Sequence, residues 1–307
     1  MISSVYRIII IGRNTLTDAV RQKVLNVLLI FSLVLVGSSV LVSQLATPGL
    51  DSSGIFDAEI KFVKDFGCGA IGLFGFAIAL LSTAQLIPQE LHNRTIYTIL
   101  AKPVRRAEFL LGKFFGIVLL LALCVALMSL AFAATLYWQE LRGIQVAGAN
   151  YGPEANWRSN PVVVDNYNHD VEGIVQQVQD PQLVEAILLI FVKLLMTTAI
   201  ALFISTFASS SIFTIVTTFM IYLIGHMEGT AREFWLSHGA ETTIWQSALV
   251  GLVSLLIPDM NSFTIVDEIL AGNHVPWSHA LNLLGYANVY LVVLLAVSIV
   301  IFDYREL

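Results

Sequence analysis

Few side chains in this sequence could do chemistry, and none of them follows a catalytic spacing. Neither His-Glu-x-x-His nor Gly-x-Ser-x-Gly occurs. No Gly-x-x-x-x-Gly-Lys-Ser/Thr phosphate loop occurs either, because Gly112-Lys113 lacks the leading glycine and is followed by Phe114. We therefore expect that the chain is not an enzyme and holds no cofactor of its own.

One stretch gathers side chains of the kinds that bind metal ions. Its members are His226, Glu228, Glu233, His238 and Glu241. Their spacing matches no compact set of metal ligands. The two cysteines, Cys68 and Cys124, lie inside apolar runs and form no zinc pattern. We predict no metal site.

Lys193 lies near the middle of an apolar run, residues 183–205. A charged side chain inside a membrane is costly and usually faces the bundle interior or a wet cavity. Two interpretations are open. Lys193 could line a translocation path and contact an anionic group, or it could form a structural pair with a carboxylate or helix carbonyls.

Long apolar blocks must position these residues. Of the 307 residues, 57% are hydrophobic and 12% are charged, against about 25% charged in a typical soluble domain. The blocks are residues 24–45, 66–87, 114–137, 183–205, 212–226 and 283–302. A run of about 18 or more apolar residues can cross the hydrocarbon core as a helix. The pattern predicts an all-α polytopic membrane protein with six transmembrane helices, the fifth barely long enough.

The segments between the blocks predict three further features. Residues 6–23 mix apolar and cationic side chains and predict an amphipathic helix on the membrane surface. Residues 138–182 predict a small extracytoplasmic insertion with short strands such as 161–164, and residues 247–257 predict a re-entrant or interfacial helix. We therefore divide the chain into 1–137, 138–182 and 183–307.

The lysines and arginines near the block ends predict the orientation. With six spans, ten lie on the side of both termini and five on the other side. Because positive residues concentrate on the cytoplasmic side, both termini are expected in the cytoplasm. The chain is then a multi-pass protein of the cell (inner or plasma) membrane, with the lipid bilayer as one partner.

Small residues mark places where helices could approach closely. Two groups occur, Gly67, Gly69, Gly72 and Gly75 in the second block and Gly112 with Gly116 at the start of the third. Small side chains allow close helix packing in membranes. We predict a packing role for both groups.

The loop between the second and third blocks, residues 88–113, is unusual for a linker. Glu90 and Arg94 are four residues apart and could pair on a helix. Lys102 precedes Pro103, where a helix would end. The apolar stripe and the following cations are Ile96, Ile99, Leu100, Arg105 and Arg106. The pattern predicts a short amphipathic helix that suits docking of a cytosolic protein, or equally a surface helix without a partner.

The loop resembles the coupling segment of the permease subunits of ABC-2 type ATP-binding cassette transporters. That segment reads roughly Glu, basic-Gly-Thr, Leu-Leu, Pro-Val and Gly-Lys. The matching residues here are Glu90, Arg94-Thr95, Ile99-Leu100, Pro103-Val104 and Gly112-Lys113, without the glycine between Arg94 and Thr95. The order of an amphipathic start, six spans and a re-entrant piece before the last span is also similar.

The resemblance implies a permease subunit that is driven, usually for export, by a separate cytosolic ATP-binding cassette ATPase. ATP and Mg²⁺ would sit on that ATPase, and a second permease chain, identical or paralogous, would complete the path. No nucleic acid is expected as a partner. The docking residues would be Glu90, Arg94, Thr95, Ile99, Leu100, Pro103, Arg105, Arg106 and Lys113.

Three other functions are open. The chain could be an ion-coupled carrier, although acidic residues are scarce in its spans. It could be a membrane anchor or signalling protein, or an ABC-type machine that moves no substrate and passes force to residues 138–182. Within the spans, polar residues beyond Ser and Thr are few, which favours a lipid-like or amphipathic cargo for a transporter.

Overall fold

The computed structural model describes residues 2–46, 52–92, 105–151, 158, 160–237, 257–270 and 275–304. Regular structure in these ranges is entirely helical, which confirms the all-α prediction. The helices are α1 (Ile2–Val20), α2 (Lys23–Ala46), α3 (Ser52–Ala84), α4 (Leu86–His92), α6 (Arg106–Asn150), α8 (Pro161–Val178), α9 (Gln182–Phe207), α10 (Ser211–Ser237), the short 3-10 helix η2 (Asn261–Thr264), α12 (Ile265–Leu270) and α13 (Trp277–Tyr304).

Five stretches of these helices are long and apolar enough to cross a membrane, so the protein is a multi-pass membrane protein. They are Lys23–Ser43, Ala58–Pro88, Arg106–Ala149, Pro161–Phe207 and Trp277–Tyr304. The apolar part of α10, Ser211–Met227, is shorter. The fifth predicted block therefore forms a helix, and the count of six spans stays a prediction.

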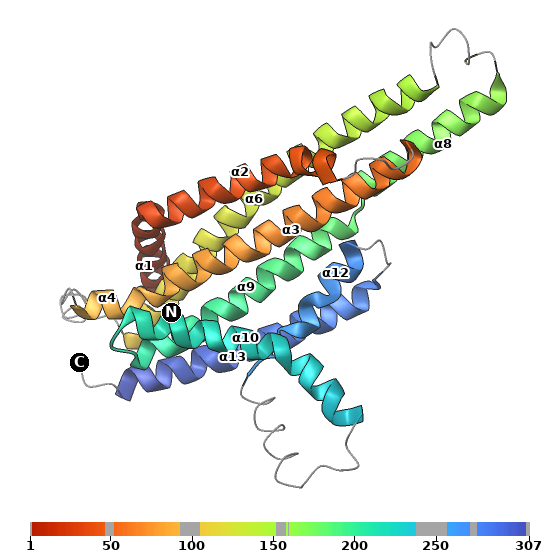
Figure 1. Ribbon diagram of the computed structural model, residues 1–307. Helices are drawn as coiled ribbons and strands as arrows, with labels where there is room; N and C mark the ends of the chain where they lie inside the picture. Colours follow the sequence, from red (N-terminus) through yellow and green to blue (C-terminus); the bar gives the residue numbers. More distant parts are fainter. Residues whose placement is uncertain are drawn as a thin grey trace.

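α9 is the central helix of the bundle (Figure 1). Sixteen of its 26 residues are buried, and it packs against α3, α6, α10 and α13. Hydroxyl side chains inside it bond to its own backbone, as Thr198 does to the carbonyl of Leu194 at 2.9 Å. This internal bonding satisfies the donors of Thr197, Thr198 and Thr206 inside an apolar bundle.

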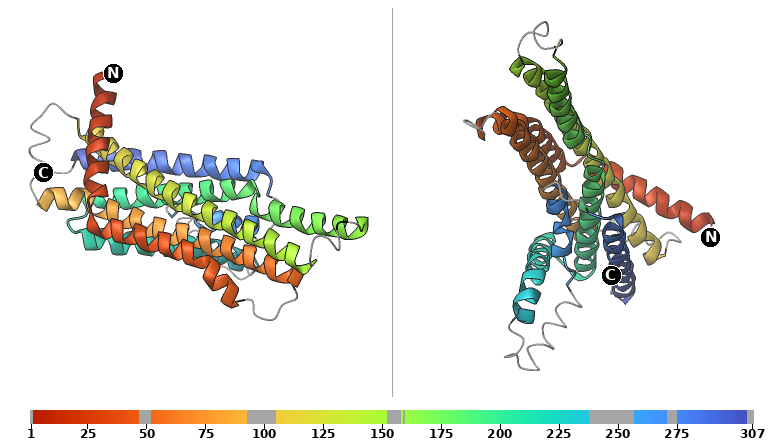
Figure 2. Two further views of the ribbon diagram at one scale, coloured as in Figure 1. Left: turned by 90° about the horizontal axis from the view of Figure 1, so that it is seen from above. Right: turned by 90° about the vertical axis from the view of Figure 1, so that its right-hand side faces the viewer.

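α1 lies across the other long helices at one end of the bundle (Figure 2). It packs against the start of α6, where glycines of both helices meet. A Cβ added at Gly116 would lie 2.6 Å from the carbonyl oxygen of Gly12, and one added at Gly112 would lie 2.7 Å from the Cβ of Ile11. Only glycine allows this close approach, which confirms the packing role predicted for Gly112 and Gly116.

α6 and α8 form a hairpin that extends past the bundle at the opposite end (Figure 1). The predicted strand at residues 161–164 is wrong, because these residues form the first turn of α8. Asn160 accepts a hydrogen bond from the backbone N–H of Val162 at 3.2 Å, and Pro161 occupies the first helical position. This start signal outweighs the β preference of three consecutive valines.

Polar contacts hold the hairpin together and to the bundle. The Tyr151 hydroxyl donates to Asp170 at 2.7 Å, and that hydrogen bond raises the pKa of Tyr151. At the base, Lys64 of α3 forms an ion pair with Asp180 at 3.7 Å. The segment predicted as an insertion, residues 138–182, thus consists of the end of α6, the helix α8 and the start of α9. Its position relative to a membrane stays a prediction.

The predicted re-entrant segment, residues 247–257, lies outside the described residues except for its last member. The chain that follows it rests on α10. The backbone N–H of Met260 donates to the carbonyl of Gly225 at 3.0 Å, and a Cβ at Gly225 would lie 2.6 Å from the carbonyl oxygen of Pro258. This close backbone contact positions η2 against α9 and α10, and α12 against α9.

Candidate functional site

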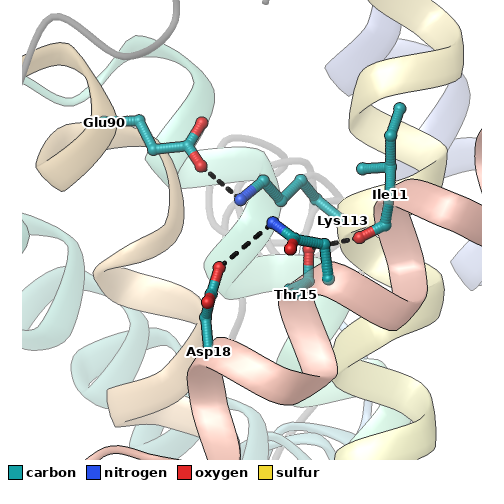
Figure 3. Close-up of polar contacts among 6 residues, drawn as sticks. Ile11, Thr15, Asp18, Glu90 and Lys113 are labelled. Carbon is teal, nitrogen blue, oxygen red and sulfur yellow. Dashed lines mark hydrogen bonds and ion pairs between the residues drawn. The ribbon is translucent and has the colours of Figure 1, made fainter.

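The first candidate site is where α4 meets the start of α6, and we call residues 86–92 and 105–113 the elbow. Glu90 of α4 forms an ion pair with Lys113 of α6, as Figure 3 shows. The two side chains are only 18% and 9% exposed. The Lys113 ammonium also lies 5.6 Å from the ring centre of Phe109. The elbow is therefore closed by a shielded pair of opposite charges.

The elbow also holds α1. Arg7 of α1 forms an ion pair with Glu108 at 3.3 Å. The same carboxylate accepts the backbone N–H of Arg105 at 3.3 Å, so Glu108 caps the start of α6 and binds α1 at once. With the glycine crossing one turn further along, α1 and α6 are joined by both packing and charge.

The elbow contacts the last turn of α13 as well. The Arg106 guanidinium donates to the carbonyls of Phe302 and Asp303, both at 3.0 Å. The rings of Phe109 and Phe302 stack with centroids 6.1 Å apart. Arg106 thus satisfies carbonyls that end a helix without an intrahelical partner. Four helices, α1, α4, α6 and α13, meet at the elbow.

The second candidate site is a cavity of about 540 Å³ among α3, α9, α10 and α12. Its charged lining residues are Lys61, Asp65, Lys193 and Asp267, and its titratable lining residues also include Cys68, Tyr222 and His226. Its apolar walls include Ile190, Leu194, Phe263 and Leu270. A volume of roughly 300–1,000 Å³ with a few polar groups among apolar walls is typical of small-molecule sites.

Lys193 contacts His226 in this cavity. The Lys193 ammonium lies 2.8 Å from Nε2 of His226, and Nδ1 of His226 lies 3.1 Å from the carbonyl oxygen of Tyr222. A carbonyl only accepts, so Nδ1 carries the proton and Nε2 accepts from Lys193. The lysine therefore has a neutral partner, neither a carboxylate nor a helix carbonyl.

Two glycines of α3 keep the cavity open. A Cβ added at Gly69 or Gly72 would meet nothing within 4 Å among the described residues. By contrast, Gly67 and Gly75 pack against Phe132 and Leu194. The packing role predicted for the four glycines is correct for Gly67 and Gly75, and it is wrong for Gly69 and Gly72 because they line the cavity.

Residues 9–307 match the family model described as ABC-2 family transporter protein. The chain belongs to the ABC-2 family. The match covers nearly the whole chain, so the elbow and the cavity both lie within it. No curated protein matches the sequence.

Four residues of the predicted docking set lie at the elbow of this ABC-2 protein: Glu90, Arg105, Arg106 and Lys113. The other five, Arg94, Thr95, Ile99, Leu100 and Pro103, lie outside the described residues. The helical pairing of Glu90 with Arg94 is therefore a prediction still, while the structure pairs Glu90 with Lys113.

Spacing along the sequence missed the partners of these residues. Lys113 and Lys193 stood out singly in the sequence, but contacts at the two sites join helices that are far apart in the chain, as Arg7 with Glu108 shows. Asp65 and Asp267 carried no motif that would have placed them in one cavity with Lys193. Within the described ranges, no three metal-ligating side chains of the ABC-2 protein gather closely enough to hold a metal ion.

Proposed function

We propose that this ABC-2 protein is the membrane subunit of an ATP-driven exporter and that a separate cytosolic ATP-binding cassette ATPase pushes on residues 88–113. The observation that supports this most is the junction of four helices at the elbow. Ion pairs and hydrogen bonds tie α4 and α6 to each other and α6 to α1 and α13. A displacement of the elbow would therefore be passed to several helices together.

The sequence supports a separate source of energy. It contains no phosphate loop, so ATP and Mg²⁺ are assigned to the partner ATPase. The excess of lysine and arginine favours a cytoplasmic elbow and cytoplasmic termini. In this orientation α1 lies on the inner membrane surface, the α6–α8 hairpin projects outside the cell, and α10 supplies a sixth span.

The cavity supports transport as the outcome of that movement. Lys193 places a charged group in the cavity within the bundle. Charged residues inside membrane bundles often mark the path of a transported substrate. A second permease chain, identical or paralogous, would complete the transporter. In the exporter, cargo is released on the side of the hairpin.

The first test is copurification of the tagged chain with an ATPase encoded beside it, followed by ATP hydrolysis in nanodiscs. Arg105 is the N-cap residue of α6 and has an exposed side chain, so Arg105→Glu is expected to weaken the complex at least tenfold. Arg158→Glu, a charge reversal of an exposed residue between α6 and α8, is the matched control and should leave the complex intact. An intact and fully coupled complex with Arg105→Glu would remove the elbow as the docking site.

The continuity of α6 favours a second candidate function, an ABC-type machine that moves no cargo. α6 is a single helix of 45 residues from the elbow to the hairpin, or about 67 Å at 1.5 Å per residue. Such a rod could pass movement directly to the hairpin. Shortening the hairpin to a tight turn separates the two candidates, because export should survive this change and force transmission should not.

A further inference from the structure

The cavity contains four charged side chains that form no ion pair with one another. Lys61 and Asp65 come from α3, Lys193 from α9 and Asp267 from α12. The ion pairs in the described part of the chain join other residues. Charges beside apolar walls are stabilised when a partner neutralises them. Two cations and two carboxylates that share a cavity without a direct ion pair are therefore suited to a ligand that carries both signs.

Lys193 is the group suited to the acidic end of such a ligand. Its contact with the neutral imidazole of His226 uses one of three N–H groups, and Lys193 takes part in none of the described ion pairs, so Asp267 attracts it only across the cavity. Lys193 is half-buried, so water screens it less than a surface lysine. A carboxylate or phosphate placed there would gain charge-assisted hydrogen bonds.

The carboxylates lie toward the open side of the cavity. Asp65 and Asp267 have exposed side chains, as does Lys61. Lys61 offsets one of the two carboxylates, so this mouth keeps a net negative charge. Gly75 packs against Leu194, the neighbour of Lys193. Asp65 comes ten residues before Gly75 in α3, or about 15 Å from that level at 1.5 Å per residue.

The rest of the lining is mainly apolar. Ile190, Leu194, Phe263 and Leu270 contribute apolar walls, and Gly69 and Gly72, which lie between Asp65 and Gly75 in α3, add room. Burial of a ligand's hydrocarbon against these walls would contribute roughly 25 cal/mol per Å² of apolar surface removed from water. The cavity thus offers a cationic inner end, an apolar middle and an acidic mouth.

We propose that this cavity binds a zwitterionic amphipathic molecule, with its acidic group on Lys193, its ammonium group at Asp65 and Asp267, and its apolar chain between them. The role of this molecule as exported cargo rests on the proposed function above. Its binding to the chain requires neither ATP nor the ATPase. The site lies within one permease chain, so it forms before any second chain is added.

The test uses the full chain in lipid nanodiscs, without nucleotide or ATPase, and empty nanodiscs as the blank. The probe is tritium-labelled ω-aminododecanoic acid, a straight chain with an acid at one end and an amine at the other. Dodecanoic acid and dodecylamine are the matched competitors that each lack one charge. We expect saturable binding of the probe, with each competitor at least tenfold weaker.

Two kinds of variant locate the site. Lys193→Met and Asp267→Asn each remove one charge and should weaken binding of the probe at least tenfold. Gly72→Leu fills the cavity with its charges intact and should abolish binding. Gly285→Leu is its control, because Gly285 is an exposed helical glycine of α13 whose added Cβ also meets nothing within 4 Å; it should bind like the unchanged chain.

Several results would overturn the proposal. Dodecanoic acid binding as tightly as the probe would show an anion site, and equal binding by dodecylamine would show a cation site. Unchanged binding by Gly72→Leu or Lys193→Met would place the ligand elsewhere. If the probe failed to bind to a chain that still couples to its ATPase, the proposed class of cargo would be refuted and the proposed exporter function would stand. Binding by a chain that recruits no ATPase would support the binding site and refute the proposed function as an ATP-driven exporter.

Discussion

Replacement of Glu90 by alanine tests how much the elbow depends on its internal ion pair. Breaking a buried pair costs about 3–5 kcal/mol and breaking an exposed pair about 0.2–1 kcal/mol. The side chains of Glu90 and Lys113 are 18% and 9% exposed, so we expect a loss of about 2–3 kcal/mol. At about 2–4 °C per kcal/mol, the unfolding temperature of the purified chain should fall by roughly 5–10 °C.

The assay separates a role within the chain from a role at the ATPase. Thermal unfolding in nanodiscs reports the stability of the elbow, and ATP hydrolysis by the copurified complex reports coupling. The exchanged variant Glu90→Lys/Lys113→Glu restores opposite charges in reversed order. If Glu90 acts by holding α4 to α6, the exchange should recover most of both readouts. If Glu90 also touches the ATPase, stability should return while coupling stays low.

A matched control keeps the comparison fair. Glu172 of α8 has an exposed side chain and forms none of the described ion pairs, so Glu172→Ala should shift the unfolding temperature by less than 1–2 °C, in line with the usual surface substitution of about ±0.5 kcal/mol. An unfolding temperature of Glu90→Ala equal to that of Glu172→Ala would refute the reasoning, because the elbow pair would then contribute nothing to stability.

Three further substitutions test other contacts. Gly116→Leu places a side chain whose Cβ would lie 2.6 Å from a backbone oxygen of α1 and should destabilise the chain by about 1–3 kcal/mol in thermal unfolding; Gly148→Leu in the same helix, where a Cβ meets nothing within 4 Å, should not. Arg106→Met removes two hydrogen bonds to the end of α13 and should speed amide exchange there about tenfold, and unchanged exchange would contradict the cap. Gly225→Ala adds a Cβ that would lie 2.6 Å from the carbonyl oxygen of Pro258, so it should weaken the contact of residues 257–264 with α10. The measurement is faster hydrogen exchange of those amides, and protection equal to that of the unchanged chain would contradict the close contact.

The sequence by itself determined which segments are helices in the bundle. Apolar runs long enough to span a membrane must bond their backbone within the segment, so composition alone predicted α2, α3, α6, α9 and α13. The motif at Glu90 and Gly112-Lys113 pointed to the ABC-2 family, which the match over residues 9–307 confirms. Hydropathy could not show that α6 continues to Asn150, because its polar last turns resemble a loop in composition.

Only the tertiary structure decided which residues meet. Contacts such as Glu90 with Lys113 and Lys193 with His226 depend on the rotation and tilt of packed helices, and apolar helices carry little periodicity that would reveal either. The same holds for glycine: Gly67 and Gly72 look alike in the sequence, yet one packs against Phe132 and the other lines an open cavity. The helices follow from local bonding in an apolar medium, whereas the sites follow from side-chain packing between distant segments.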